Sequence, residues 1–156
     1  MHGNKKVIDS LNRLLENELS AIDQYFIHSR MYQDWGYDKL YERLDHEMDE
    51  EKQHCDWIIK RILFLEGTPN MSKRRPLLIG DDVESMMKND LTLELEVVKA
   101  VREVIAICEA EHDYESRNIL QKLLFDTEED HVFWLEQQVG LIDKIGLPNY
   151  IQSQMG

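Results

Sequence analysis

Four long stretches of the chain largely lack the residues that end helices. Glycine and proline are scarce, at seven and three in 156 residues. Those that divide the chain are Gly36, Gly67 with Pro69, Pro76, Gly80, and Gly146 with Pro148. Between them, apolar residues recur at steps of three and four, the period of an amphipathic helix, and no alternating β-strand pattern occurs. We therefore predict an all-α protein with helices over about 5–35, 39–66, 82–112 and 114–144.

The lengths of the predicted connections decide the topology. Only a few residues around Gly36 join the first two helices, and residues 111–114 join the last two as tightly, by a bend or a kink, so each pair forms an antiparallel hairpin. Segment 67–81 reaches about 50 Å when extended, which exceeds the ~40 Å length of a 27-residue helix. We therefore predict a four-helix bundle with one long crossover. Pro148 predicts a short fifth helix over about 148–154.

The apolar stripe of each predicted helix is interrupted near its middle by side chains of metal-binding types. Every stripe carries a glutamate there, and the second and fourth helices add a histidine three residues later, in Glu51-Lys-Gln-His54 and Glu128-Glu-Asp-His131. Residues three apart lie on one face of an α-helix, so each pair directs a carboxylate and an imidazole to one point. The six candidate metal ligands are Glu18, Glu51, His54, Glu94, Glu128 and His131.

The two halves of the chain repeat this arrangement, because Glu51 follows Glu18 by 33 residues and Glu128 follows Glu94 by 34. We expect two similar hairpins to meet around a pseudo-two-fold axis. No Lys or Arg shares the stripes, and buried carboxylates without a cation are costly. Two divalent cations would offset the four carboxylates, and Glu with His but no Cys suits iron, manganese or zinc. The pattern predicts a dinuclear metal site, which supports redox chemistry on dioxygen if the metal is iron.

The alternative interpretation is that these groups are ordinary hydrogen-bonded core residues. One Glu-x-x-His motif is expected by chance in a chain with 31 acidic residues. Two such motifs, each on an apolar stripe and each matched by a glutamate on another helix, are much harder to obtain by chance. The metal site is therefore the preferred interpretation.

Three weaker signals lie nearby. Tyr25 is either a core aromatic or a side chain that hydrogen-bonds a ligand or supplies electrons. Glu47, one turn before the second glutamate, is a candidate for an acid that supports the ligands from outside. His46 and Glu50, at i and i+4, form either a solvated pair or a weak cation site.

Composition excludes several classes of partner. The formal net charge of −13 disfavours nucleic acid and anionic membrane surfaces and favours cations. Cys55 and Cys108 match neither a disulfide framework nor a thiolate metal site. The first residues lack the apolar segment of a signal peptide, and no stretch reaches ~18 apolar residues. We therefore expect one cytoplasmic domain over 1–156 that neither enters a membrane nor binds nucleic acid.

Motifs along the whole chain carry a family resemblance. They are NELSAIDQYFIHSRM, RILFLEG, LLIGDD, HDYESR and GLIDKIGLPNYIQSQM. With them the chain resembles the bacterioferritins and their close bacterial ferritin relatives. The resemblance implies a shell of 24 subunits that oxidises ferrous iron at dinuclear centres within each subunit and stores ferric mineral inside. It places the family's six ligands on the six residues named above, a four-fold pore at Asn149 and Gln152, and an inner-surface iron site at His46 and Glu50.

The chain departs from the family at one position. In bacterioferritins the methionine that ligates haem follows directly after the second glutamate ligand, and here that position is Lys52. The nearest methionine is Met48, one turn earlier on roughly the same face. We predict that this subunit by itself binds little or no haem, with haem on Met48 as the alternative.

Other functions remain in competition with a ferroxidase. Rubrerythrin-like peroxide reductases resemble a bundle fused to a Cys-ligated iron domain, which two isolated cysteines cannot build. Di-iron oxygenases are usually larger and need a substrate pocket, for which the compact pattern of this chain leaves little room. The non-enzymatic alternative is a storage or structural shell subunit with an inert metal site. We expect a ferroxidase in a homo-oligomeric shell, or in a shell mixed with a haem-binding relative.

Overall fold

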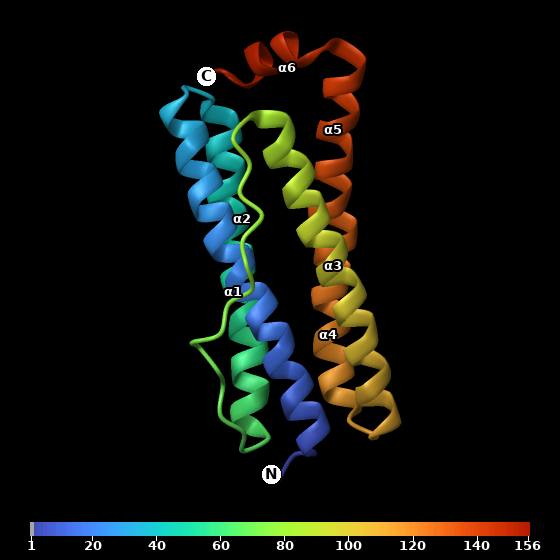
Figure 1. Ribbon diagram of the computed structural model, residues 1–156. Helices are drawn as coiled ribbons and strands as arrows, with labels where there is room; N and C mark the ends of the chain where they lie inside the picture. The colour runs from blue at the N-terminus through green and yellow to red at the C-terminus, as the bar shows by residue number, and fades with distance from the viewer. Residues whose placement is uncertain (1) are drawn as a thin grey trace.

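The computed structural model describes residues 2–156, most of which lie in helices. The helices are α1 (Lys5–Asp34), α2 (Asp38–Phe64), α3 (Val83–Ala110), α4 (Tyr114–Asp126), the π-helix η1 (Thr127–Val132), α5 (Phe133–Ile145) and α6 (Leu147–Gln154). Because α4, η1 and α5 follow one another without a break, the main body is a four-helix bundle (Figure 1). The predicted all-α bundle with a short fifth helix is confirmed.

The connections follow the predicted pattern. Two hairpins form the bundle: α1 pairs with α2, and α3 pairs with α4–α5. Segment 65–82 connects them and runs along the bundle from one end to the other (Figure 1). Helix α6 lies across the end of the bundle opposite the N-terminus. Over residues 2–156, no helix combines the length and apolarity that crossing a bilayer requires.

Side chains mark the helix ends. The Asn4 carboxamide oxygen accepts a hydrogen bond from the Lys6 amide at the start of α1. Asp82 and Ser85 form a capping box at the start of α3. Between α3 and α4 the chain turns at His112, whose φ of 61° lies in the left-handed region. The connection between these helices is therefore a tight bend rather than a kink.

The crossover is attached to α1 by a row of polar side chains spaced by four or eight residues. Four side chains of α1 accept hydrogen bonds from backbone amides of the crossover at 2.8–3.1 Å. The pairs are Asn12 with the Asn70 amide, Ser20 with Arg75, Gln24 with Leu78, and His28 with Gly80. An extended segment outside a sheet has no backbone partners of its own, so these side chains satisfy its buried donors. The sequence pattern did not predict these hydrogen bonds between α1 and the crossover.

A buried acid on α3 completes the attachment. Because His28 Nε2 accepts from the Gly80 amide, its Nδ1 carries the proton and donates to Asp90 at 2.8 Å. Gln24 donates to the same carboxylate oxygen at 2.9 Å. All three side chains are fully buried. The network ties α1, α3 and the crossover into one unit.

The apolar core has two parts. One includes residues 7–19 of α1, residues 55–62 of α2 and Leu65 just after α2, and the other includes residues 21–32 of α1 and 40–48 of α2. Helices α3 and α4–α5 likewise contribute apolar side chains to both parts. Between the two apolar parts lies a layer of buried acidic and histidine side chains.

We expect His28→Ala to loosen the crossover. The change leaves the Gly80 amide without its acceptor and removes one donor to Asp90, and an unsatisfied buried group costs about 1–3 kcal/mol. Amide hydrogen exchange across residues 77–82 should accelerate roughly 5- to 150-fold, as followed by mass spectrometry. The exposed His46 supplies the control, because His46→Ala should leave exchange in this segment unchanged. Equal exchange rates in the two variants would show that the row does not hold the crossover.

Candidate metal centre

The structure brings five of the six predicted ligands into the polar layer between the two apolar parts. Each is at most 1% exposed. They come from four different elements: Glu18 from α1, Glu51 and His54 from α2, Glu94 from α3 and His131 from η1. Their convergence follows from one helical period continuing through each apolar stripe, since the residues that point into the core at mid-helix meet at mid-bundle.

The five side chains form two triads that share Glu51. In the first, the Nδ1 atom of His54 lies 3.4 Å from a Glu18 oxygen and 3.5 Å from a Glu51 oxygen. In the second, the Nδ1 atom of His131 lies 3.0 Å from the other Glu51 oxygen and 3.7 Å from a Glu94 oxygen. One ligand atom from each member of a triad lies within 4.8 Å of the others, so each triad has the size of a cation site. A shared carboxylate between two such sites is the arrangement that two neighbouring metals require.

The triads fit metal ions because most of their inward-facing atoms have no hydrogen-bond partner. Among the described residues, eleven buried side-chain oxygen and nitrogen atoms lack a hydrogen-bond partner, and seven belong to these five residues. Buried polar atoms are normally paired, so this concentration of unpaired atoms needs an explanation. A cation in each triad supplies the missing partner for both oxygens and Nδ1 nitrogens.

Without a cation, the cluster retains protons. Burial and the neighbouring Glu51 raise the pKa of Glu18 to about 8. Burial by itself lowers the pKa of His54, but contacts with Glu18 and Glu51 raise it to about 11. The carboxylates around His131 raise its pKa in the same way. The excess negative charge therefore attracts positive charge of any kind, and metal ions must displace these protons.

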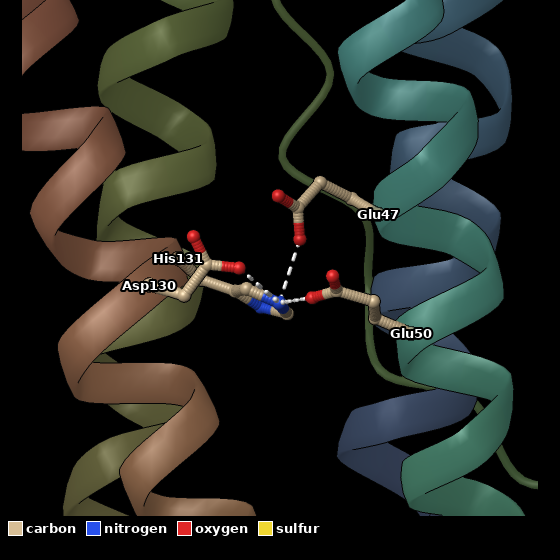
Figure 2. Close-up of side chains that lie close together, drawn as sticks. All are labelled: Glu47, Glu50, Asp130 and His131. Carbon is tan, nitrogen blue, oxygen red and sulfur yellow. Dashed lines mark hydrogen bonds and ion pairs between the residues drawn. The ribbon is translucent and has the colours of Figure 1, made fainter.

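The outer nitrogen of each histidine faces further carboxylates. His54 Nε2 lies 3.2 Å from Asp126, and His131 Nε2 lies 2.6 Å from both Glu47 and Glu50. Figure 2 shows the imidazole of His131 reaching from η1 towards Glu47 and Glu50 of α2. The hydrogen bond with His131 lowers the pKa of Glu50 to about 2. Such contacts hold a histidine with its other nitrogen directed at the metal.

A third group, formed by Glu47, Glu50, Asp130 and His131, also has the size of a cation site. Its carboxylates already have protein partners, however. Arg43 binds Glu47 at 2.7 Å and Asp130 at 3.0 Å, and His46 contacts Glu50 at 2.8 Å. This group therefore serves to orient His131. Of its members, the sequence pattern indicated Glu47 as a supporting acid and missed Asp130, whose position depends on the π-helix.

Tyr25 lies against the second triad. Its hydroxyl donates a hydrogen bond to Glu94, and burial together with the Glu94 carboxylate raises the pKa of the phenol well above its usual value. Tyr25 thus remains protonated, and one of the Glu94 oxygens accepts its hydrogen bond. Both interpretations of Tyr25 therefore apply, because its ring belongs to the second apolar part of the core and its hydroxyl donates to the predicted ligand Glu94.

The structure does not bring Glu128 to the cluster. Its side chain is partly exposed and forms an ion pair with Arg102 of α3 at 2.6 Å. The reason is η1, because a π-helix closes its hydrogen bonds over five residues, so residues four apart rather than three come closest to one face. Thr127 is therefore the residue that shares the inward face with His131. It is fully buried, and its hydroxyl donates to the Leu123 carbonyl at 2.9 Å.

Comparison with known proteins identifies the family of the chain. Residues 8–145 match the family model of the ferritin-like domain. The chain is 56% identical to a bacterial ferritin of Synechocystis over 99% of both chains, and 58% identical to a bacterial ferritin of Pseudomonas aeruginosa over 99% of this chain and 100% of that protein. It is 44% identical to a bacterioferritin of Rhodobacter capsulatus over 94% of this chain and 90% of that protein. The chain therefore belongs to the ferritin-like family, among its bacterial ferritins and bacterioferritins.

Proposed function

We propose that this protein is a ferroxidase that oxidises ferrous iron at a dinuclear centre and stores the ferric product inside a 24-subunit shell. The observation that carries the proposal is the pair of buried triads that share Glu51 and in which seven buried atoms lack a hydrogen-bond partner. The names of the relatives support iron as the metal. Iron is here the substrate, and each ferrous ion supplies one electron to the oxidant, dioxygen or peroxide.

The residues of the two triads have distinct tasks in this proposal. Glu18 with His54 holds one ion, Glu94 with His131 holds the other, and Glu51 bridges them. Carboxylate oxygens favour the harder ferric product over the ferrous substrate, which assists oxidation. The apolar parts on either side of the layer limit the access of water. Glu128 is the sixth ligand of the proposal, and it would have to leave its ion pair with Arg102 to reach the site.

Removing Glu18 should abolish fast iron oxidation. Glu18→Ala deletes the only carboxylate that α1 contributes to the triads, so oxidation should slow by at least about 100-fold. Stopped-flow absorbance of ferric iron after mixing apo-protein with ferrous iron in air measures the rate. Glu16→Ala removes a carboxylate two residues away in α1 and should oxidise iron at the normal rate. Unchanged kinetics in Glu18→Ala, with helix content intact by circular dichroism, would refute the site and favour an inert storage subunit.

Other di-iron oxidoreductases fit less well. A rubrerythrin-like enzyme needs a Cys-ligated iron domain, and the two cysteines of this chain are buried on different helices, Cys55 on α2 and Cys108 on α3. Burial raises the pKa of both thiols, which disfavours the thiolates that bind iron. Neither cysteine belongs to a candidate metal group among the described residues.

The subunit should assemble into a closed shell. Large apolar side chains stand on its surface, among them Phe26, Phe64, Phe125 and Phe133, each about half exposed or more. A single bundle would leave these rings in water, whereas subunit contacts would cover them. Sedimentation should therefore give a particle of about 450 kDa, corresponding to 24 chains of 18.6 kDa. A particle of monomer mass at neutral pH and low concentration would contradict the shell. Co-purification with a second subunit type would indicate a mixed shell.

Haem does not fit the residues of this subunit. Lys52 is exposed on α2, and a protonated amine has no lone pair for iron. Met48, the alternative ligand, is only 7% exposed and belongs to the second apolar part of the core. Reaching a haem between two subunits would require Met48 to leave that core, which close packing opposes. A haem-binding relative in a mixed shell would supply haem instead.

The absorption spectrum of protein expressed with ample haem tests this expectation. The wild type should show no Soret band, and Lys52→Met should create one at a stoichiometry of one haem per two subunits. Gln53→Met adds a methionine at the next exposed position of α2, where it faces a different direction, and should remain colourless. A Soret band in the wild type at that stoichiometry would assign haem to Met48.

A further inference from the structure

The helix that carries Glu128 can place either of two residues opposite His131. In the present arrangement η1 puts Thr127 on the inward face, and Glu128 points out to Arg102. If the same segment were α-helical, Glu128 would lie on the inward face, three residues before His131. The choice between a hydroxyl and a carboxylate at this place therefore depends on where the extra residue of the π turn lies.

The preceding turn of the helix accommodates both registers. Leu123 is buried in the core and lies one turn before Thr127, whereas Leu124 is half-buried and lies one turn before Glu128. A shift of the π turn towards the N-terminus would exchange Leu123 for Leu124 on the inward face. Because both residues are leucine, this exchange in the preceding turn buries no polar side chain there and keeps the volume of the apolar core. In that turn the two registers are therefore similar in packing.

The contact that holds Glu128 outside is weak. Arg102 is largely exposed, with 64% of its side chain accessible, and Glu128 is 31% exposed. Ion pairs in such surroundings contribute little, because water and salt screen them. A stronger partner would therefore remove Glu128 from Arg102 easily.

Two divalent ions would be that partner. The triads contain three carboxylates, Glu18, Glu51 and Glu94, so two divalent ions with neutral imidazoles would leave one positive charge in excess in a buried layer. An uncompensated buried charge is costly. The first ion leaves no such excess, so the demand for a fourth carboxylate arises only when the second ion enters. Glu128 is the residue whose inward register would meet it.

We infer that Glu128 is a ligand with two positions, docked on Arg102 when the site holds fewer than two metal ions and turned inward when the second ion binds, with η1 as the hinge. This inference rests on the proposed dinuclear site and adds the order of events within it. For Glu128 to take the place of Thr127 on the inward face, the π turn must move towards the N-terminus, ahead of Glu128. Binding of the second ion thus includes a conformational step, which Arg102 opposes.

Calorimetric titration of metal-free protein with Zn²⁺, which undergoes no oxidation, measures the affinity of the first and second ions. We expect two ions per subunit in the wild type. Glu128→Gln should weaken the second ion about 10- to 100-fold and leave the first unchanged. Arg102→Gln should strengthen the second ion about two- to fivefold, because the competing ion pair is lost. Glu129→Gln removes an exposed carboxylate from the same turn and serves as the matched control.

The double variant Arg102→Gln/Glu128→Gln separates a specific contact from general repulsion. If Arg102 acts by holding Glu128, its replacement has no effect on Zn²⁺ affinity once Glu128 is gone. An equal gain in affinity in both backgrounds would mean that Arg102 only repels cations, and would overturn the inference. Equal affinities in the wild type, Glu128→Gln and Glu129→Gln would also overturn it, while two bound ions would leave the proposed site standing. Fewer than two ions in the wild type would refute the dinuclear site itself.

Deletion of Thr127 provides an independent test. The deletion removes the extra residue and leaves Glu128 in the α-helical register that faces inward. The second Zn²⁺ ion should then bind at least as tightly as in the wild type, and Arg102→Gln should have no further effect. A second ion as weak as in Glu128→Gln, in a deletion variant with normal helix content, would contradict the two-register hinge.

Discussion

Burial of three carboxylates and two imidazoles in the middle of an apolar bundle is the constraint on which the structure depends. The layer formed by Glu18, Glu51, His54, Glu94 and His131 divides the core in two, and seven buried atoms of these residues have no hydrogen-bond partner within the protein. Such a layer destabilises the bundle unless positive charge enters it. The fold therefore supplies the shape of the site at the expense of its own stability, as is common where a site is built for a ligand.

The remaining polar contacts hold this layer in place from outside. Asp126 faces the outer nitrogen of His54, and Glu47 and Glu50 face that of His131, so both rings keep Nδ1 directed inward. One turn from Glu94 on α3, Asp90 binds side chains of α1 that also attach the crossover. The long connection thus does more than span the bundle. It locks α1 against α3, the two helices that contribute one carboxylate each.

The π-helix introduces the one asymmetry between the two halves. The α1–α2 half contributes Glu18, Glu51 and His54 from ordinary α-helices, whereas the other half presents His131 from a π turn and directs Glu128 to the surface. One half of the site is therefore carried by regular α-helices, and the other depends on a π turn. Because π turns are strained relative to α-helices, they occur where a residue must be placed in a direction that a regular helix does not allow.

The sequence by itself determined the helices, the crossover and five of the residues in the polar layer. A helical period that persists over some 30 residues averages out local errors, and Glu18 or Glu94 lies in the middle of such a period. Only the tertiary structure decided the direction of Glu128, because one extra residue in a turn alters the inward face without altering the composition of the helix. It also decided the partners of His28 and Asp90, since hydrogen bonds between segments distant in the chain leave no periodic trace in the sequence.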